Sequence, residues 1–166
     1  MEMLSKLINE LKNTDPRIRL IAASKISELG RDAAEAVPAI IELLEREEIL
    51  MGSSPPPNES PLDRMTREQA IIPKQATLTL SKIGNVDVLS NLLKHQVGLV
   101  RLAAVEALGT IGPSAKDSQA SLAMLAAFDI NDHIRIAAAT ALKKILVQER
   151  KFQKVDTKKK SWKFWK

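Results

Sequence analysis

An internal repeat constrains this chain more than any other feature of its sequence. Three segments align without gaps, and they begin at Ile18-Arg19, Val100-Arg101 and Ile134-Arg135. In each segment, apolar residues stand one position before the arginine and three, seven and ten positions after it. This spacing places them on one stripe of an α-helix. After the arginine, the stripe consists of Ala22, Ile26 and Leu29 in the first segment, Ala104, Leu108 and Ile111 in the second, and Ala138, Leu142 and Ile145 in the third.

The ends of these segments carry helix-termination signals. Gly30 and Gly112 stand eleven positions after the arginine, where a residue with left-handed backbone commonly ends a helix. The third segment has Leu146 there, so we expect its helix to continue toward the C-terminus. A degenerate fourth copy has Pro73 in place of the arginine, and proline is tolerated in the first turn of a helix. This copy places Ala76, Leu80, Ile83 and Gly84 at the repeated offsets.

A second apolar-periodic segment precedes each of these helices, at about residues 3–12, 35–50, 86–95 and 117–128. Antiparallel helix pairs that recur along a chain are typical of a helical solenoid. From Arg19 to Pro73 there are 54 positions, against 34 from Arg101 to Arg135, and the extra residues include a Gly-, Ser- and Pro-rich stretch. We therefore expect an all-α fold over residues 1–148. It would be a right-handed α-solenoid, or superhelix, of about four helical hairpins and about eight helices, with an inserted Pro-rich loop at 51–62.

The composition narrows the possible function classes. The chain has no cysteine, which excludes disulfides, thiolate nucleophiles and cysteine-based zinc sites. His95 and His133 are the only histidines, and a turn or helix-end role suits them better than a metal or acid–base role. The sequence contains no glycine-rich phosphate loop, nucleophile elbow or paired-histidine zinc motif. We expect no enzymatic activity, no metal, no cofactor and no small-molecule substrate.

The N-terminal segment predicts no signal peptide, because it lacks a basic leader and Lys6, Asn9 and Glu10 interrupt its apolar positions. No apolar run approaches the roughly 20 residues that span a bilayer. A cytoplasmic protein is expected, and peripheral contact with a membrane surface is an additional hypothesis that the C-terminal residues raise.

The chain resembles HEAT-repeat proteins, which belong to the armadillo-like class. The stretch Asp15-Pro16-Arg17-Ile18-Arg19, followed by two alanines and by Leu29-Gly30, carries this resemblance. The stretch from Leu99 to Gly112 matches the same pattern. The sequence is especially similar to the short bacterial HEAT-like type seen in phycobilin lyase subunits. The resemblance covers about residues 1–148 and implies a fold rather than a function, since HEAT arrays serve many unrelated partners.

The resemblance also implies a structural role for the repeated arginines. In the family, an aspartate before the second helix of each pair and an arginine at its start form a ladder along the stack. Asp15 and Arg19 match this pattern, and Arg135 matches it in part with Asn131 or Asp132. Arg101 has no aspartate at the corresponding place. A row of arginines that binds a ligand is the alternative interpretation.

The second helix of each pair lines the inner surface of a HEAT array, and this predicts a partner-binding face. Residues five, eight and nine positions past the arginine lie opposite the apolar stripe. They are small, polar and mixed in charge, which suits a protein surface better than an apolar pocket for a small molecule. The set comprises Ser24, Ser27, Glu28, Ser81, Lys82, Glu106, Gly109, Thr110, Thr140, Lys143 and Lys144.

The C-terminal tail, residues 149–166, is the most unusual segment of the sequence. From residue 150 onward there are eight lysine or arginine residues and one aspartate, a formal charge of +7. Because the whole chain carries +5, the preceding residues carry −2. The tail also holds four of the five aromatic residues, Phe152 among them, and both tryptophans. The residues expected to make contact are Lys158, Lys159, Lys160, Trp162, Lys163, Phe164, Trp165 and Lys166.

Three kinds of contact fit this composition. Tryptophan and phenylalanine favour the bilayer interface, and lysine is attracted to anionic headgroups. A protein partner, or packing of the tail on its own protein, is a second possibility. Stacking on single-stranded nucleic acid is a third.

These observations predict a non-enzymatic scaffold or adaptor that binds a protein partner through its inner face. The basic aromatic tail would contact an anionic membrane surface or a partner. One alternative is a subunit or chaperone-like factor of a phycobilin lyase-type system. Another is a nucleic-acid-binding HEAT-like protein. The latter is disfavoured because residues 1–149 carry −2 and contain no Trp or Tyr to stack on a base.

Overall fold

The computed structural model describes residues 2–52, residue 64 and residues 70–163, and it describes side-chain burial as far as residue 147. All regular structure in these residues is helical, and they contain no β-strand. The predicted all-α class is therefore confirmed. In chain order the helices are α1 (Glu2–Glu10), α2 (Pro16–Leu29), the 3-10 helix η1 (Gly30–Ala36), α3 (Val37–Gly52), α5 (Ile71–Ile83), α6 (Val86–Leu92), α7 (Gly98–Ile111), the 3-10 helix η2 (Gly112–Ser118), α8 (Gln119–Phe128) and α9 (Asp132–Lys163).

Local sequence explains where several helices begin. Asp15 caps α2, since its carboxylate accepts a hydrogen bond from the backbone N–H of Arg17 at 2.9 Å, and Pro16 occupies the first helical position. Asn85 caps α6 in the same way through the N–H of Val88. Pro73 lies in the first turn of α5, where its missing N–H leaves no broken helix bond.

Glycines end three of the repeat helices at the predicted positions, and Gly84 after α5 has the expected left-handed conformation, with φ of 68° and ψ of 21°. Gly30 and Gly112 follow α2 and α7 with φ of 57° and 71°, and their ψ values of −126° and −133° lie in a region open almost only to glycine. Each glycine turns the chain into a 3-10 helix, η1 or η2, that leads into α3 or α8. The two turns share this conformation because the two sequences share the glycine.

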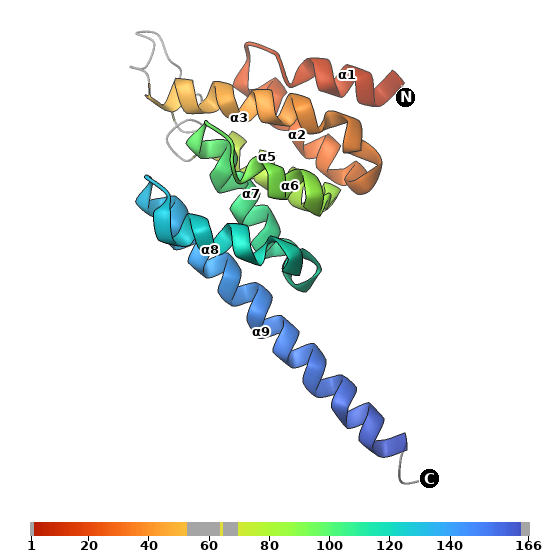
Figure 1. Ribbon diagram of the computed structural model, residues 1–166. Coiled ribbons are helices and arrows are strands. Elements are labelled where there is room, and N and C mark those ends of the chain that lie inside the picture. Colours follow the sequence, from red (N-terminus) through yellow and green to blue (C-terminus); the bar gives the residue numbers. More distant parts are fainter. Residues whose placement is uncertain (1, 53–63, 65–69, 164–166) are drawn as a thin grey trace.

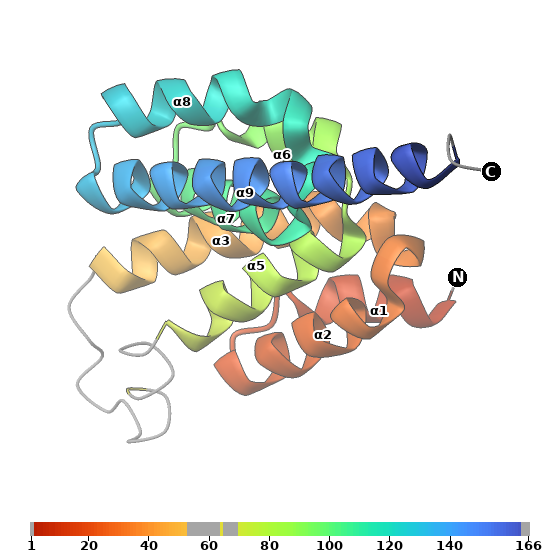
Figure 2. The same cartoon turned by 90° about the horizontal axis from the view of Figure 1, so that it is seen from below.

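Helices α2, α5, α7 and α9 contact one another in that order (Figure 1). Each of them also contacts the α-helix that precedes it in the chain. Thus α1 packs on α2, α3 on α5, α6 on α7 and α8 on α9. The view from below shows α9 beside α7 and α8 (Figure 2). Residues that the sequence places in successive repeats therefore lie in neighbouring helices.

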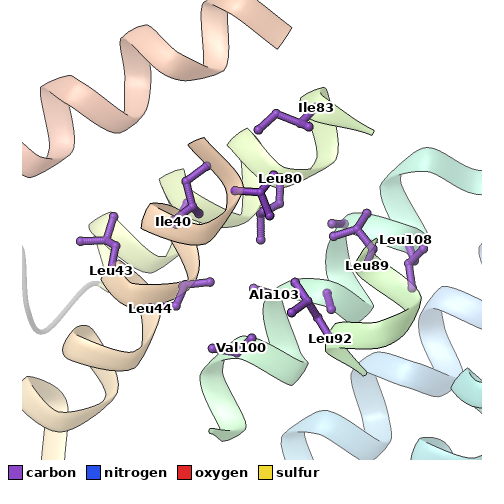
Figure 3. Close-up of a cluster of buried hydrophobic side chains, with 14 of the residues drawn as sticks. Ile40, Leu43, Leu44, Leu80, Ile83, Leu89, Leu92, Val100, Ala103 and Leu108 are labelled. Atoms are coloured by element: carbon purple, nitrogen blue, oxygen red, sulfur yellow. The ribbon is translucent and has the colours of Figure 1, made fainter. Parts of the chain in front are cut away.

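The interior is made of aliphatic side chains from several helices. Figure 3 shows Ile40 and Leu44 of α3, Leu80 of α5, Leu89 of α6 and Leu108 of α7 gathered in one cluster. All five are almost fully buried. A core of this kind is stabilised by burial of apolar surface, at about 25 cal/mol per Å².

Small residues allow the repeat helices to approach closely. Ala22, Ala104 and Ala138, which occupy the same repeat position, are completely buried. At Gly109 of α7, an added Cβ would lie 2.9 Å from the Cβ of Ala141 on α9. Glycine at this position therefore sets the distance between the two helices.

Helix α9 extends beyond the rest of the protein. The predicted continuation past Leu146 is confirmed, because α9 runs without interruption from Asp132 to Lys163. At 1.5 Å per residue it is about 48 Å long, and its C-terminal part projects away from the other helices (Figure 1). The tail predicted at 149–166 thus begins as a continuation of α9. Phe164, Trp165 and Lys166 lie outside the described residues.

The Pro-rich loop predicted at 51–62 falls mostly outside the described residues, and Met51 and Gly52 form the last turn of α3. In the part of the chain that the structure describes, no helix combines the length and apolar character needed to cross a membrane.

Candidate functional site

A groove of about 340 Å³ crosses the surface of three successive helices, α5, α7 and α9. We call it the α5–α7–α9 groove. Its walls are formed by short polar side chains, three charged side chains and a few small apolar residues. Its lining consists of Lys74, Thr77, Leu78, Ser81, Glu106, Gly109, Thr110, Ala137, Thr140, Ala141 and Lys144.

The groove brings together six residues that the repeat pattern assigned to the partner-binding face: Ser81, Glu106, Gly109, Thr110, Thr140 and Lys144. Lys82 and Lys143 are exposed outside it. Ser24 is half-buried on α2, and Glu28 lines a separate groove of about 410 Å³ between α1 and α2. Partner binding by any of these residues remains a prediction.

Two residues of the predicted face, Ser27 and Gly109, are buried, although Gly109 still borders the groove. Both stand eight positions past the arginine of their repeat. The hydroxyl of Ser27 has no hydrogen-bond partner among the described residues. The expected exposure is wrong at these two residues, and at Gly109 the reason is that Ala141 of the next repeat helix packs against it. At the same offset, Lys143 is exposed and Ser81 lines the groove.

The hydroxyl groups in the groove share one hydrogen-bonding state. Each donates to a carbonyl oxygen of its own helix: Thr77 to Pro73, Ser81 to Leu78, Thr110 to Glu106 and Thr140 to Ile136, at 2.7 to 2.9 Å. A hydroxyl has one hydrogen and two acceptor lone pairs. These four groups therefore offer acceptors to a bound molecule rather than donors.

Glu106 is the one acidic side chain of the groove, and its surroundings raise its pKa. Protein around the carboxyl reduces its hydration and raises the pKa, whereas the positive charges of Lys144 and Lys74 act in the opposite direction. The Glu106 side chain remains exposed. Its carboxyl group is therefore only partly dehydrated by the walls of the groove and is not buried in the protein interior. Among the described residues, its carboxylate accepts no hydrogen bond and has no cation within 4 Å.

The repeated arginines occupy two similar buried sites. The Arg19 guanidinium donates to Glu47 Oε1 at 2.8 and 3.0 Å and to the carbonyls of Asn13 and Thr14. Both charged side chains are almost fully buried. The arginine thus joins the turn before its own helix to the end of the following α-helix, α3.

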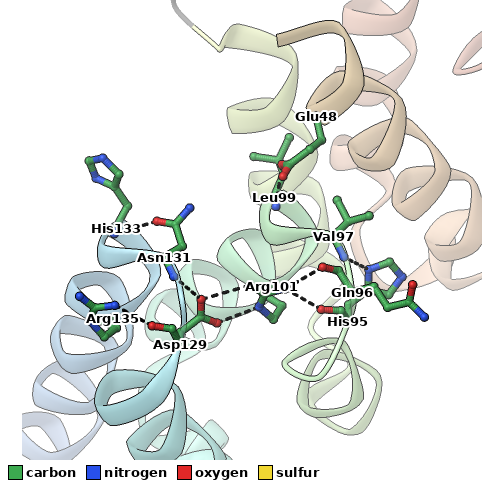
Figure 4. Close-up of polar contacts among 10 residues, drawn as sticks. All are labelled: Glu48, His95, Gln96, Val97, Leu99, Arg101, Asp129, Asn131, His133 and Arg135. Carbon is green, nitrogen blue, oxygen red and sulfur yellow. Dashed lines mark hydrogen bonds and ion pairs between the residues drawn. The ribbon is translucent and has the colours of Figure 1, made fainter. Parts of the chain in front are cut away.

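Arg101 repeats this arrangement at the start of α7, two repeat helices after α2 (Figure 4). It donates to the two carboxylate oxygens of Asp129 at 2.8 and 3.1 Å, and to the carbonyls of His95 and Gln96. The Arg101 side chain holds the pKa of Asp129 below its ordinary value, mainly through these hydrogen bonds. In both sites the acid lies 28 residues after the arginine.

The pairing expected for the ladder is wrong in detail. The Asp15 side chain makes its hydrogen bonds with Arg17 rather than with Arg19. Arg135 pairs with Asp132, as the partial match proposed, and also donates to the carbonyl of Asp129 at 2.7 Å. Arg19 and Arg101 cap turns and each bind an acid in or directly after the next α-helix, and the local pattern did not identify these partners, Glu47 and Asp129.

Two more contacts fix the N-terminus of α7. The backbone N–H of Leu99 donates to the Glu48 carboxylate of α3 at 2.9 Å, across 51 residues (Figure 4). His95 accepts from the N–H of Val97 through Nδ1, and its Nε2 lies 3.3 Å from Glu45. His95 is therefore a turn residue in this structure.

An apolar groove of about 510 Å³ lies on another part of the surface, where α8 meets the turn before α7. Met124, Phe128 and Ile130 line it and are 61, 76 and 91% exposed. The repeat pattern did not identify these residues, since they stand outside the recurring offsets.

The fold is all-helical in the described residues, and a groove lined by hydroxyl, charged and aliphatic groups crosses three of its successive helices. Comparison with protein-family models and with curated proteins found no match for this chain. The described residues contain no group of three or more His, Asp or Glu side chains placed to hold a metal ion.

Proposed function

We propose that this protein is a HEAT-type helical solenoid of about four hairpins that acts as a non-enzymatic scaffold or adaptor. Its partner is a protein, and the α5–α7–α9 groove is the surface that binds it. One observation carries this proposal. Six residues that the repeat pattern assigned to one face line a single groove across three helices.

The recurring arginine sites support a repeat architecture. Arg19 and Arg101 start two repeat helices, bind the carbonyls of the preceding turn and pair with an acid 28 residues later. Contacts between each repeat helix and the next also fit a solenoid, whose units contact mainly their neighbours.

The chemistry of the groove favours a protein partner over a small molecule or a nucleic acid. Small-molecule pockets enclose their ligand, whereas this groove is open and its lining mixes hydroxyl, charged and aliphatic groups. The four hydroxyls already donate hydrogen bonds to helix carbonyls, so they are poor donors to phosphate oxygens. Glu106 places a negative charge on the middle helix of the groove, between Lys74 and Lys144 on the flanking helices.

The C-terminal tail adds a second contact in this proposal. Residues 150–163 carry seven lysine or arginine residues and one aspartate, and they belong to the part of α9 that projects away from the other helices. A basic helix with aromatic residues at its end suits an anionic membrane surface or an acidic region of the partner. We infer a cytoplasmic protein with peripheral membrane contact.

Affinity capture from the cells that make the protein tests the groove. The Thr140→Trp variant fills the groove, and Ala120→Trp, on an exposed part of α8 outside it, is the matched control. The proposal predicts that a protein retained by the wild type and by the control is lost with Thr140→Trp. Equal retention by both variants contradicts it. Visible absorbance in the captured material would instead support the phycobilin lyase-type alternative.

A further inference from the structure

We propose that the α5–α7–α9 groove recognises a single arginine of its protein partner, carried in an otherwise acidic segment. The Glu106 carboxylate would be the counter-ion of the arginine, and the hydroxyl oxygens of Thr110, Thr140 and Ser81 would accept its remaining hydrogens. This inference rests on the proposed function and names the chemistry of the ligand.

The hydrogen bonds that the groove hydroxyls already make favour a ligand that donates hydrogen bonds. The hydrogens of the Ser and Thr hydroxyls that line it are directed to helix carbonyls, so only their lone pairs remain for a ligand. The Glu106 carboxylate is also an acceptor. An arginine side chain has five N–H donors and no acceptor, so its guanidinium complements this lining better than any other side chain.

The position of Glu106 indicates a recognition role. It is located on α7, the middle helix of the three, and lines the groove between residues of α5 and α9. It has no ion-pair partner within 4 Å among the described residues, although the protein around it raises its pKa. A charge held in a partly dehydrated concave surface without a close partner is a candidate binding group.

The two lysines that flank Glu106 in the groove determine which residues can stand beside the arginine in the partner segment. Lys74 on α5 and Lys144 on α9 line the same groove and both act electrostatically on Glu106. A segment with several basic residues would place a cation against one of these lysines, whereas a segment with acidic neighbours would place carboxylates there. The pattern acid–arginine–acid therefore complements the sequence of charges lysine–glutamate–lysine across the three helices.

Peptide binding to the full-length protein tests this inference. The probe is the acetylated peptide Glu-Ala-Glu-Arg-Glu-Ala-Glu, and its analogue has citrulline in place of arginine, with nearly the same shape but no charge. Binding is followed by NMR at the backbone amides of Gly109, Thr110 and Thr140. We expect the arginine peptide to shift these signals and the citrulline peptide to bind there at least about tenfold more weakly, since a charge-assisted pair is lost.

The basic tail is the main source of nonspecific binding in this experiment. The citrulline analogue distinguishes binding to the tail from binding to the groove. The citrulline peptide is more acidic, so a tail that attracts acidic peptides binds the analogue more tightly than the arginine peptide. The inference predicts the opposite order at the groove signals. Glu106→Gln should remove this preference, whereas Glu35→Gln, an exposed glutamate of η1, should retain it.

The result separates the inference from the proposed function. If neither peptide shifts the groove signals, or if both shift them equally, the inference is overturned. It is also overturned if Glu106→Gln leaves the preference unchanged. In each of these cases the proposed function stands as long as Thr140→Trp still abolishes capture of the partner. If Thr140→Trp has no effect on capture, the proposed function fails whatever the peptides do.

Discussion

Arg101 and Asp129 join the start of α7 to the end of α8 through two hydrogen bonds of 2.8 and 3.1 Å. The same guanidinium also binds the two carbonyls of the turn that precedes α7. Both charged side chains are largely buried, at 13 and 3% exposure. The Arg101 side chain therefore donates hydrogen bonds to the turn before α7 and to the Asp129 carboxylate, and in this way it links two helix pairs.

Arg101→Met should destabilise the protein strongly. The variant leaves the Asp129 carboxylate without its counter-ion, and breaking such a pair costs about 3 kcal/mol. For a chain of this size, that corresponds to a fall in melting temperature of about 6–12 °C. Thermal unfolding followed by circular dichroism measures the change. The control is Lys12→Met, which breaks the exposed pair with Glu42 and should cost less than about 1 kcal/mol.

The Asp129 carboxylate also predicts how stability depends on pH. Its pKa in the folded protein is lowered, so it contributes stability above its ordinary pKa near 3.8 and loses that contribution as pH falls through the lower folded value. Asp129→Asn should therefore be less stable than the wild type at pH 7. The difference should be constant above about pH 5 and narrow below pH 4. Urea unfolding across this range measures it, and a difference that does not change with pH would refute the assigned role.

Gly109→Ala should destabilise the contact between α7 and α9. The new Cβ would lie 2.9 Å from the Cβ of Ala141, and overpacking of this kind costs about 1–3 kcal/mol. The cost should appear even though alanine favours a helix over glycine by about 1 kcal/mol. Gly52→Ala, where nothing lies within 4 Å of the added Cβ, should be neutral or slightly stabilising. Adding Ala141→Gly to the first variant should restore part of the loss.

Anionic vesicles should bind the full-length protein through its tail. Trp162 and Trp165 are the only tryptophans, so their emission should move to the blue as they leave water. Neutral vesicles should bind much less, and added salt should weaken binding without abolishing it. Replacing Trp162, Phe164 and Trp165 with alanine should abolish membrane binding.

The opposite pattern would assign the tail a different contact. A tail that binds nucleic acid electrostatically would prefer oligonucleotides and lose most of its affinity between low and physiological salt. Blue emission in the absence of vesicles would indicate that the tryptophans pack against protein, and the membrane hypothesis would then be withdrawn.

The helices and much of the groove could be predicted because both depend on local periodicity. Offsets of five and nine residues from the arginines found Glu106, Thr110, Thr140 and Lys144, since these positions face away from the apolar stripe on any helix. The offset of eight residues gave a wrong prediction of exposure at Gly109, because the next repeat helix covers this residue. A single helix viewed alone does not reveal which side its neighbour occupies.

Other features depend on contacts between residues far apart in sequence. Glu47 and Asp129 are unremarkable in their own segments and acquire a role only where the chain returns to Arg19 and Arg101. Their common separation of 28 residues was a usable signal, but local motif matching favoured Asp15 instead. Lys74 and Ala137 also line the groove, from positions outside the recurring offsets.

Site-specific photo-crosslinking tests most directly whether the α5–α7–α9 groove binds a protein partner. A benzophenone amino acid would replace Thr110 inside the groove or Ala120 on α8 outside it, in the full-length protein within the cells that make it. The account predicts that irradiation links a specific protein to position 110 and not to position 120. It also predicts that adding Thr140→Trp removes this product. Equal cross-linking at both positions, or none at position 110, would contradict the assignment of the groove as the binding surface.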